Sequence, residues 1–262
     1  MRLFLFSDLD YTAHHPEAPQ NDNALADYLD DLSGQGVEVF LCYVTGRSYP
    51  NLVEKITPTP IPKPSYAICG VGTQVHHFGS GKIVEQWETH LALQEKEGWS
   101  HGGIQQAAEK FFAAHSLAVP PLDPAWHLPH KLTYLVENMT QESLAALQKS
   151  MEAEGFKVNL VYSADIYLDI LPGGCNKGLA IDWFVKEHGI VAQPGDVVVF
   201  AGDSGNDIEG FSAQALTHRI VLGERPEVIV PLTKNGLLEK SIHMKDGFGP
   251  VELVKGLRQI LG

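Results

Sequence analysis

The strongest constraint on the fold is a set of short apolar runs, each of which ends abruptly in polar residues. These runs are Leu3–Phe6, Val39–Val44, Tyr66–Cys69 and Val197–Ala201. Every position in them is apolar, so each run predicts a strand that is buried on both faces. Segments with apolar residues at helical spacing separate the runs. Buried strands that alternate with helices predict a parallel sheet covered by helices on both sides.

The pattern changes between Gly81 and Leu171. Here apolar and polar residues alternate, which is typical of strands in an antiparallel sheet with one solvated face. Such strands are expected at Lys82–Trp87, Lys131–Glu137, Lys157–Ser163 and Tyr167–Leu171, with two helices between them. The segment is far too long for a loop, so we expect an inserted domain. The predicted fold is therefore α/β: a Rossmann-like core of residues 1–80 and 172–262, and an inserted α/β domain of residues 81–171 with a mainly antiparallel sheet.

Charge and hydropathy argue against several classes of protein. The chain has 262 residues and a formal net charge of −13, which repels phosphate backbones and anionic membranes. Its longest apolar run, Val39–Val44, is far shorter than the roughly 20 residues that span a bilayer, and its apolar start is too short for a signal peptide. Cys42, Cys69 and Cys175 form no C-x-x-C pair and are expected to be reduced thiols. We expect a cytoplasmic protein that binds neither nucleic acid nor membranes.

Four polar segments stand at the carboxyl ends of predicted parallel strands, and the third of them also opens a helix. They are Asp8–Thr12, Thr45–Ser48, Asn176–Gly178 and Gly202–Asp207. Because the carboxyl ends of parallel strands meet at one edge of a sheet, these segments should gather several carboxylates and a lysine. Crowded carboxylates repel one another in a cleft of low dielectric constant, and a hard divalent cation such as Mg²⁺ offsets that repulsion. The lysine and hydroxyl groups would hold a phosphoryl group, which predicts phosphoryl transfer to a carboxylate.

The four segments, read in order as DLDYT, TGRS, NKG and GDSGND, resemble the haloacid dehalogenase superfamily of phosphohydrolases. The insertion between the second and third motifs is similar to the large cap of the Cof-type branch. Further motifs resemble sucrose-phosphate phosphatases: TGRSY at 45–49, GVGTQVHH at 70–77, and ILP at 170–172 followed by NKG. The resemblance covers roughly residues 1–80 and 170–262.

The resemblance implies a role for each matched residue. Asp8 would be the nucleophile that becomes an aspartyl phosphate, and Asp10 would protonate the leaving alcohol and then activate water. The phosphate-binding positions would be Thr45, Gly46, Lys177 and Asn206. The Mg²⁺ ligands would be Asp8, Asp10 through its main-chain carbonyl, Asp203 and Asp207.

Other positions remain open between two interpretations. Arg47 either contacts substrate or caps the helix that follows it, and Lys131 either reaches the sugar or is a solvated strand lysine. Tyr11 stands where the family usually has a small residue or Asn, and the His14-His15 segment also departs from the family pattern. The roles of Tyr11 and of this segment are not predicted.

The leading functional hypothesis is a Mg²⁺-dependent phosphatase for a small-molecule sugar phosphate, with sucrose 6-phosphate as the best candidate. The alternatives are a phosphatase for mannosyl-3-phosphoglycerate or glucosylglycerol phosphate, a sugar phosphomutase, and a non-catalytic phosphosugar-binding module. A mutase must bind a second phosphate, yet residues 81–171 contain no Arg. A non-catalytic module typically loses its nucleophile or acid, whereas Asp8 and Asp10 are both present. Association with a cognate sugar-phosphate synthase, the identity of the sugar and the oligomeric state stay open.

Overall fold

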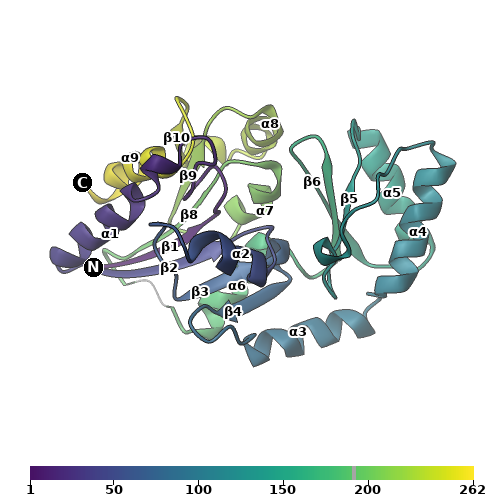
Figure 1. The fold of residues 1–262 in the computed structure, drawn as a ribbon, viewed down its shortest axis with the longest axis horizontal. Coiled ribbons are helices and arrows are strands. Elements are labelled where there is room, and N and C mark those ends of the chain that lie inside the picture. The colour runs from purple at the N-terminus through teal and green to yellow at the C-terminus, as the bar shows by residue number, and fades with distance from the viewer. Residues whose placement is uncertain (191–192) are drawn as a thin grey trace. The chain divides into compact units, whose positions relative to one another are not determined.

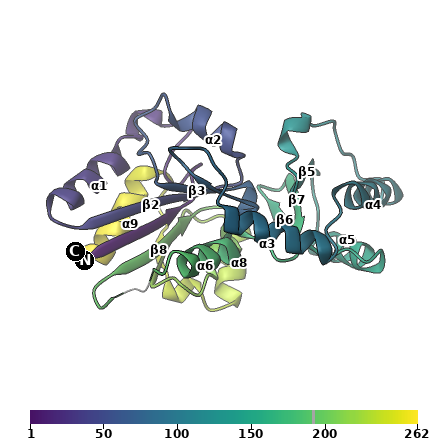
Figure 2. The ribbon, with the colours of Figure 1, turned by 90° about the horizontal axis from the view of Figure 1, so that it is seen from below.

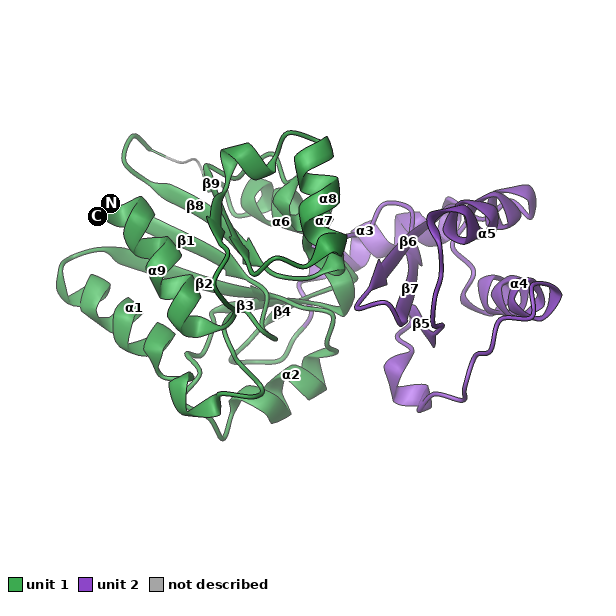
Figure 3. Ribbon diagram, turned by 90° about the horizontal axis from the view of Figure 1, so that it is seen from above, with its two compact units in different colours: residues 1–82, 177–262 green, residues 83–176 purple. Residues whose placement is uncertain are grey.

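A computed structural model describes residues 1–190 and 193–262 of the chain, which divides into two compact units (Figures 1 and 3). Unit 1 consists of residues 1–82 and 177–262, and unit 2 of residues 83–176. The sequence placed these boundaries at 80/81 and 171/172. The second boundary lies later because β7 (Tyr167–Pro172) pairs along its whole length with β6 (Val158–Ser163) of unit 2. Within the described residues, no helix combines the length and the apolar character needed to cross a membrane.

Unit 1 is built on a sheet with strand order β10-β9-β8-β1-β2-β3-β4 among the described residues. Its neighbouring strands are parallel except for β3 and β4, which are antiparallel. The strands are β1 (Arg2–Ser7), β2 (Glu38–Val44), β3 (Tyr66–Cys69), β4 (Gln74–His77), β8 (Val197–Gly202), β9 (His218–Leu222) and β10 (Ile242–Met244). The strand order reverses at β1, and a ligand crevice is expected at the carboxyl ends of the strands at such a point.

Helices cover both faces of this sheet (Figure 2). They are α1 (Ala24–Gly34), α2 (Tyr49–Ile56), α6 (Lys177–Glu187), α7 (Ile208–Phe211), α8 (Pro226–Lys234) and α9 (Pro250–Leu261). Side chains of β1 alternate between the two faces. Leu3 and Leu5 belong to a buried cluster with residues of α1, α2 and α9, whereas the ring of Phe6 packs 6.0 Å from that of Phe184 on α6. The predicted parallel sheet with two covered faces is confirmed.

Unit 2 has its own antiparallel sheet, ordered β5-β7-β6 with β5 at Leu132–Leu135. Its helices are α3 (Glu85–Lys96), α4 (His101–Ala114) and α5 (Gln141–Ala153). Leu132 and Ile170 project from one face of the sheet into a buried cluster with residues of α4 and α5. The alternating residues Lys131 and Asp169 therefore lie on the opposite face, which explains the alternation in the sequence.

One predicted strand, Lys82–Trp87, is wrong. The helix α3 begins at Glu85, and its buried residues include Trp87 and Leu91. These two residues are four positions apart and therefore share one face of a helix, where both are withdrawn from water. Lys82–Trp87 includes Trp87 but not Leu91, so the helical spacing of the buried residues is not visible within these six residues. Their apolar and polar residues were therefore interpreted as the alternation of a strand. The strands β4, β9 and β10 were not predicted.

Candidate active site

The segment after β1 places Asp8 at the carboxyl end of the central strand. The backbone N–H of Asp8 donates to the carbonyl of Ala201 on β8 at 2.9 Å, and the Ser7 hydroxyl donates to the Asp8 carbonyl at 2.7 Å. The Asp8 residue is only 5% exposed. Backbone pairing with β8 therefore continues up to Asp8, and its carboxylate is held at the place where the sheet order reverses.

Lys177 joins two carboxylates that come from distant parts of the chain. It is the first residue of α6 and is completely buried. Its Nζ donates to Asp8 Oδ1 at 2.8 Å and to Asp207 Oδ1 at 2.7 Å. A buried ammonium group is costly unless it is paired, so these two carboxylates account for its position.

The loop after β8 folds around the Asp207 carboxylate. Asp207 Oδ2 accepts hydrogen bonds from the backbone N–H groups of Asp203 and Ser204, both at 3.0 Å. The turn needs glycine at position 202, because a β-carbon there would lie 2.5 Å from Asp207 Cγ. The glycine and the aspartate of this motif are thus parts of one close-packed turn.

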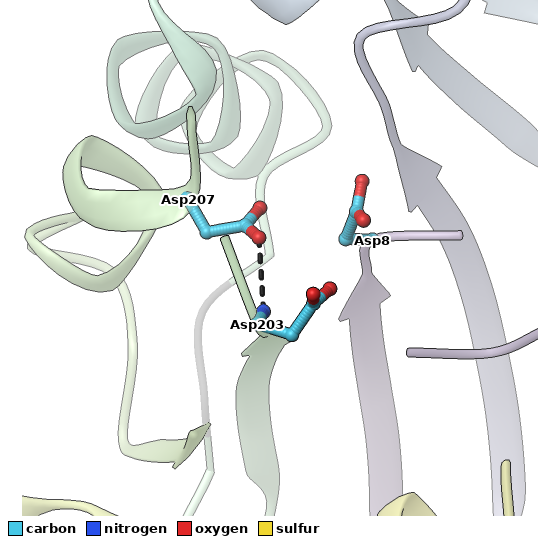
Figure 4. A group of neighbouring side chains, drawn as sticks. All are labelled: Asp8, Asp203 and Asp207. Carbon is cyan, nitrogen blue, oxygen red and sulfur yellow. Dashed lines mark hydrogen bonds between the residues drawn. The ribbon is translucent and has the colours of Figure 1, made fainter. Parts of the chain in front are cut away.

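Asp8, Asp203 and Asp207 together form a buried acidic cluster (Figure 4). Each offers a carboxylate oxygen, and these oxygens all lie within 4.8 Å of one another. Carboxylate oxygens are the ligands that hard divalent cations prefer. The donor set therefore fits such a cation. The Asp10 side chain does not belong to this cluster.

The protonation of this cluster reflects its burial. Burial raises the pKa of Asp8 to about 7, helped by the charges of Asp207 and Asp10 and opposed by Lys177. Burial and the neighbouring charges of Asp207 and Asp8 raise the pKa of Asp203 well above its usual value. Burial opposes the charge of Lys177, but Asp207 and Asp8 outweigh it and raise the pKa of that lysine. The three carboxylates outnumber the buried Lys177 ammonium, and a bound cation would add further positive charge.

Asp10 points its carboxylate at Arg47. Arg47 Nε donates to Asp10 Oδ2 at 2.7 Å, and Nη2 donates to Oδ1 at 2.8 Å. Arg47 also contacts Asn51, which lies in the helix α2. Both groups remain about 30% exposed, with Arg47 at 30% and Asp10 at 31%. The structure thus gives Arg47 a partner that sequence analysis did not consider.

The predicted phosphate-binding residues gather beside this cluster. Thr45 follows β2, is 1% exposed, and accepts a hydrogen bond from the Arg47 N–H at 3.2 Å. A β-carbon at Gly46 would lie 3.8 Å from Asn206 Nδ2, so these two motifs are neighbours. Asn206 Oδ1 is buried and has no hydrogen-bond partner within the described part of the chain. An unpaired buried amide oxygen is expensive, and a ligand at this place would satisfy it.

Lys131 belongs to unit 2 and does not lie in the same compact unit as these residues. It is 5% exposed, and its Nζ donates to Asp169 Oδ1 at 2.9 Å and to Thr133 Oγ1 at 2.7 Å. The solvated strand lysine considered in the sequence analysis is therefore wrong. A buried ion pair explains its position within the unit, and its contact with a sugar stays a prediction.

Sequence analysis missed Arg225, which lies beside the acidic cluster. Its Nη1 is 3.1 Å from Asp203 Oδ2. Arg225 follows β9, whose apolar residues Ile220–Leu222 mark another buried parallel strand. Recognising that run would have placed Arg225 at the same edge of the sheet as Asp8 and Asp203.

Comparisons with known proteins find similarity to sugar-phosphate phosphatases. A family model described as "Sucrose-6F-phosphate phosphohydrolase" matches residues 1–247. Sucrose-phosphatase 1 of Nicotiana tabacum is 28% identical over 233 residues, which cover 87% of this chain and 52% of that protein. Mannosylfructose-phosphate phosphatase of Agrobacterium fabrum is 25% identical and is matched over 72% of this chain and 71% of its own. The chain spans about half the length of the plant sucrose-phosphatases that it matches.

A solved structure shares the fold. The sucrose-phosphatase from Synechocystis, determined in complex with sucrose and phosphate, superposes with a TM-score of 0.82 at 24% sequence identity. The alignment covers 99% of this chain and 98% of that one. The α/β fold with a separate antiparallel sheet is therefore confirmed, as is the resemblance to sucrose-phosphate phosphatases. Because the family model covers nearly all of its length, this chain belongs to the sucrose-6F-phosphate phosphohydrolase family.

Proposed function

We propose that this chain is a Mg²⁺-dependent phosphatase that hydrolyses a sugar phosphate, with sucrose 6-phosphate as the substrate, through an aspartyl phosphate on Asp8. Membership of the family supports a phosphoric monoester hydrolase. The observation that carries the proposal is the environment of the Asp8 carboxylate. It is buried, bound by Lys177, and within ligand distance of Asp203 and Asp207 (Figure 4).

In the first step, a carboxylate oxygen of Asp8 forms a bond to phosphorus while the bond from phosphorus to the sugar oxygen breaks. Lys177 binds Oδ1, which leaves Oδ2 as the attacking atom. Asp10 gives its proton to the departing sugar oxygen, so the sugar leaves as a neutral alcohol. Thr45, the Gly46 backbone N–H and the Asn206 Nδ2 group would donate hydrogen bonds to the phosphoryl oxygens, whereas the unpaired Asn206 Oδ1 can accept only from a donor on the ligand.

In the second step, Asp10 acts as a carboxylate and takes a proton from water. The water oxygen attacks the phosphorus of the aspartyl phosphate, which releases inorganic phosphate, and the Asp8 carboxylate is restored. Arg47 lies against this carboxylate, because its Nε and Nη2 donate to the two Asp10 oxygens. Its two parallel hydrogen bonds also fix the direction in which that carboxylate points.

The donor set at the sheet edge fits Mg²⁺. Asp8, Asp203 and Asp207 would hold it, together with the main-chain carbonyl of Asp10. When bound, the ion would offset the carboxylates that face a dianionic phosphate and polarise the phosphoryl oxygens. Burial is the main cause of the raised pKa values of Asp8 and Asp203, and neighbouring carboxylates add to it, so a bound cation would favour the ionised forms of both residues.

The choice of sugar is assigned to unit 2. The phosphate-binding residues of unit 1 contact a group that all phosphate esters share, so discrimination between alcohols needs other residues. The sheet of unit 2 has a polar face with Lys131, Thr133 and Asp169 joined by hydrogen bonds. Polar side chains held in one orientation are suited to sugar hydroxyls. Association with a sugar-phosphate synthase stays a prediction.

The proposal is tested by phosphate release from a panel of substrates. The panel contains sucrose 6-phosphate, mannosylfructose phosphate, glucosylglycerol phosphate, mannosyl-3-phosphoglycerate and simple hexose phosphates, each with Mg²⁺ and with excess EDTA. We expect turnover of a disaccharide phosphate that requires Mg²⁺. Release of no phosphate from any ester would favour a binding module. Interconversion of phosphate positions on a hexose would favour a mutase, and full activity in EDTA would reject the metal-dependent mechanism.

A further inference from the structure

Arg225 is held against two aromatic rings at the edge of the acidic cluster. Its guanidinium carbon lies 4.9 Å from the centroid of the Tyr11 ring and 5.0 Å from that of Phe248. The two rings pack edge to face with centroids 6.1 Å apart. A guanidinium group at such distances is attracted by the ring faces, and its planar shape suits the contact. The two rings therefore restrain the Arg225 side chain independently of its contact with a carboxylate.

The Tyr11 side of this arrangement is fixed by the backbone. Tyr11 has a φ of +59°, which is uncommon for a residue other than glycine and indicates a conformation imposed by its surroundings. Its carbonyl accepts a hydrogen bond from the Gly249 N–H at 2.6 Å, which ties the nucleophile loop to the segment that carries Phe248. The His15 ring packs 5.5 Å from the Tyr11 ring on the same loop.

The partner of Arg225 is Asp203, and both of its carboxylate oxygens are engaged. Thr12 Oγ1 donates to Oδ1 at 2.9 Å, and Arg225 Nη1 lies 3.1 Å from Oδ2. The second contact is an ion pair without hydrogen-bond geometry, since Oδ2 has no hydrogen-bond partner among the described residues. Each carboxylate oxygen retains a lone pair for a cation. Thr12 and Arg225 thus orient the Asp203 carboxylate from its two oxygens, and both oxygens can still bind a cation.

We propose that Arg225, held by Tyr11 and Phe248, is a positioning residue that orients the Asp203 carboxylate for the divalent cation. This inference rests on the metal site of the proposed function. It also gives Tyr11 a role, because the ring at this unusual position supports the arginine that holds Asp203. Outer residues that orient a metal ligand typically contribute about 10–100-fold to metal affinity.

Arg225 has two opposing effects on the affinity of the site for the cation: charge repulsion, and orientation of Asp203. A positive charge beside the site repels Mg²⁺, so its removal alone would tighten binding. Orientation of Asp203 favours Mg²⁺, so its loss would weaken binding. Without Arg225, the Asp203 carboxylate keeps its hydrogen bond from Thr12 but loses the cation that offsets repulsion by Asp8 and Asp207, so it would turn away from them. Orientation therefore outweighs repulsion.

The test measures Mg²⁺ binding to the full chain by isothermal titration calorimetry, with MgCl₂ and no substrate. Arg225→Gln removes the charge and keeps a polar, though shorter, side chain, and we expect its Kd for Mg²⁺ to rise about tenfold or more. Arg225→Lys keeps the charge without the planar group and should recover only part of the affinity. Arg258→Gln is the matched control. It removes an arginine that lies 5.4 Å from the Tyr28 ring, in the same unit, and its Kd should stay within about twofold of the wild type.

The outcomes separate the possibilities. An unchanged Kd in Arg225→Gln, with only a lower melting temperature, would reduce Arg225 to a structural role and overturn the proposal. A tighter Kd would overturn it as well, because repulsion would then be the larger effect. If Arg225→Gln fails to fold, Phe248→Leu removes one supporting ring and keeps the arginine, and its Kd should rise by a smaller factor. An unchanged Kd there would contradict the proposal.

Failure of the proposed function is distinguishable from failure of this inference. If the wild type binds no Mg²⁺, the metal site itself is wrong and the role of Arg225 falls with it. If the wild type binds Mg²⁺ and Arg225→Gln does not weaken binding, only the role of Arg225 is wrong. If Mg²⁺ binding depends on Arg225 but no sugar phosphate is hydrolysed, the inference stands and the proposed reaction is wrong.

Discussion

Lys177 has an environment that an ordinary turn between a strand and a helix does not provide. Its ammonium group is fully withdrawn from water between Asp8 and Asp207, which come from opposite halves of unit 1. If Lys177 paired with only one of these carboxylates, the other would keep its full repulsion of the remaining carboxylates in the cluster. Placing the lysine there links the loop that follows β1 to the loop that follows β8.

Replacement of this lysine should therefore be costly. Lys177→Met leaves Asp8 and Asp207 buried without their shared cation, and we expect a loss of about 3–5 kcal/mol in the free energy of unfolding in EDTA. Urea denaturation measures it. Lys255→Met is the matched control, because Lys255 pairs with Glu252 on the surface of α9 and is 57% exposed. That control should lose no more than about 1 kcal/mol. Equal losses in the two variants would contradict the account.

Residues of the site differ in how well their partners could be foreseen. Asp8, Asp203 and Asp207 follow recognisable parallel strands, so their convergence could be predicted from the sheet edge. Lys177 instead follows β7, which lies in the antiparallel sheet of unit 2. The partner of Asp10 could not, because nothing in the TGRS motif indicates whether Arg47 turns toward a substrate, a helix or a carboxylate. The place of Arg225 depends on rings at positions 11 and 248, and contacts across such sequence distances leave no local signal.

At the scale of the elements, an ion pair ties the amino-terminal ends of two central strands. Asp196, just before β8, accepts hydrogen bonds from the backbone N–H of Arg2 at 2.9 Å and from its side chain, with Nε at 3.0 Å. Arg2 begins β1, which pairs with β8. The Arg2 side chain is the main cause that lowers the pKa of Asp196 to about 2. The pair lies at the end of the strands opposite to the acidic cluster.

The sign of the pH dependence follows from that lowered pKa. A carboxyl group with a lower pKa in the folded protein stabilises it above the ordinary value of 3.8, and this contribution disappears as the pH falls through about 2. Asp196→Asn should therefore lower the melting temperature at pH 7, and the difference from wild type should shrink between pH 4 and pH 2. Thermal unfolding monitored by circular dichroism measures this. A difference that grows in acid would show that the assigned cause is wrong.

The elements themselves were predictable where burial on both faces left a continuous apolar run. Val39–Val44 and Val197–Ala201 lie within β2 and β8 as expected. The prediction failed at Lys82–Trp87, where the pattern of apolar residues in a short segment is compatible with both a strand and a helix. It also failed at β10, because Ile242–Met244 has three residues and contains a histidine. Edge strands of that length carry too little apolar sequence to stand out.

At the scale of the whole molecule, each unit has its own buried core. In unit 1 the cluster unites residues from both ends of the chain, such as Leu3, Leu25 and Leu257. In unit 2 it unites the sheet with α4 and α5. Because each core closes within its own unit, each unit can be treated as a separate folding domain.

This division predicts the effect of removing unit 2. Replacement of residues 83–176 by a short glycine linker should leave measurable hydrolysis of p-nitrophenyl phosphate, because the nucleophile and metal ligands all belong to unit 1. The same change should erase the preference for a disaccharide phosphate over a hexose phosphate, since the groups proposed to bind sugar hydroxyls are lost. Ratios of kcat/KM measure the preference, and circular dichroism checks that the core remains folded. A folded core that keeps the preference would place specificity in unit 1.

The central claim is covalent catalysis by Asp8, and it is tested most directly by trapping the intermediate. The enzyme is mixed with ³²P-labelled sucrose 6-phosphate and Mg²⁺, quenched in acid within milliseconds, and digested. The account predicts a transient acid-stable label on the peptide that contains Asp8. It also predicts no label and at least a ~10³-fold lower kcat in Asp8→Asn. Asp196→Asn, which removes a carboxylate remote from the site, should label like the wild type. Label on another residue, or an Asp8→Asn variant that retains a tenth of the wild-type kcat, would contradict the account.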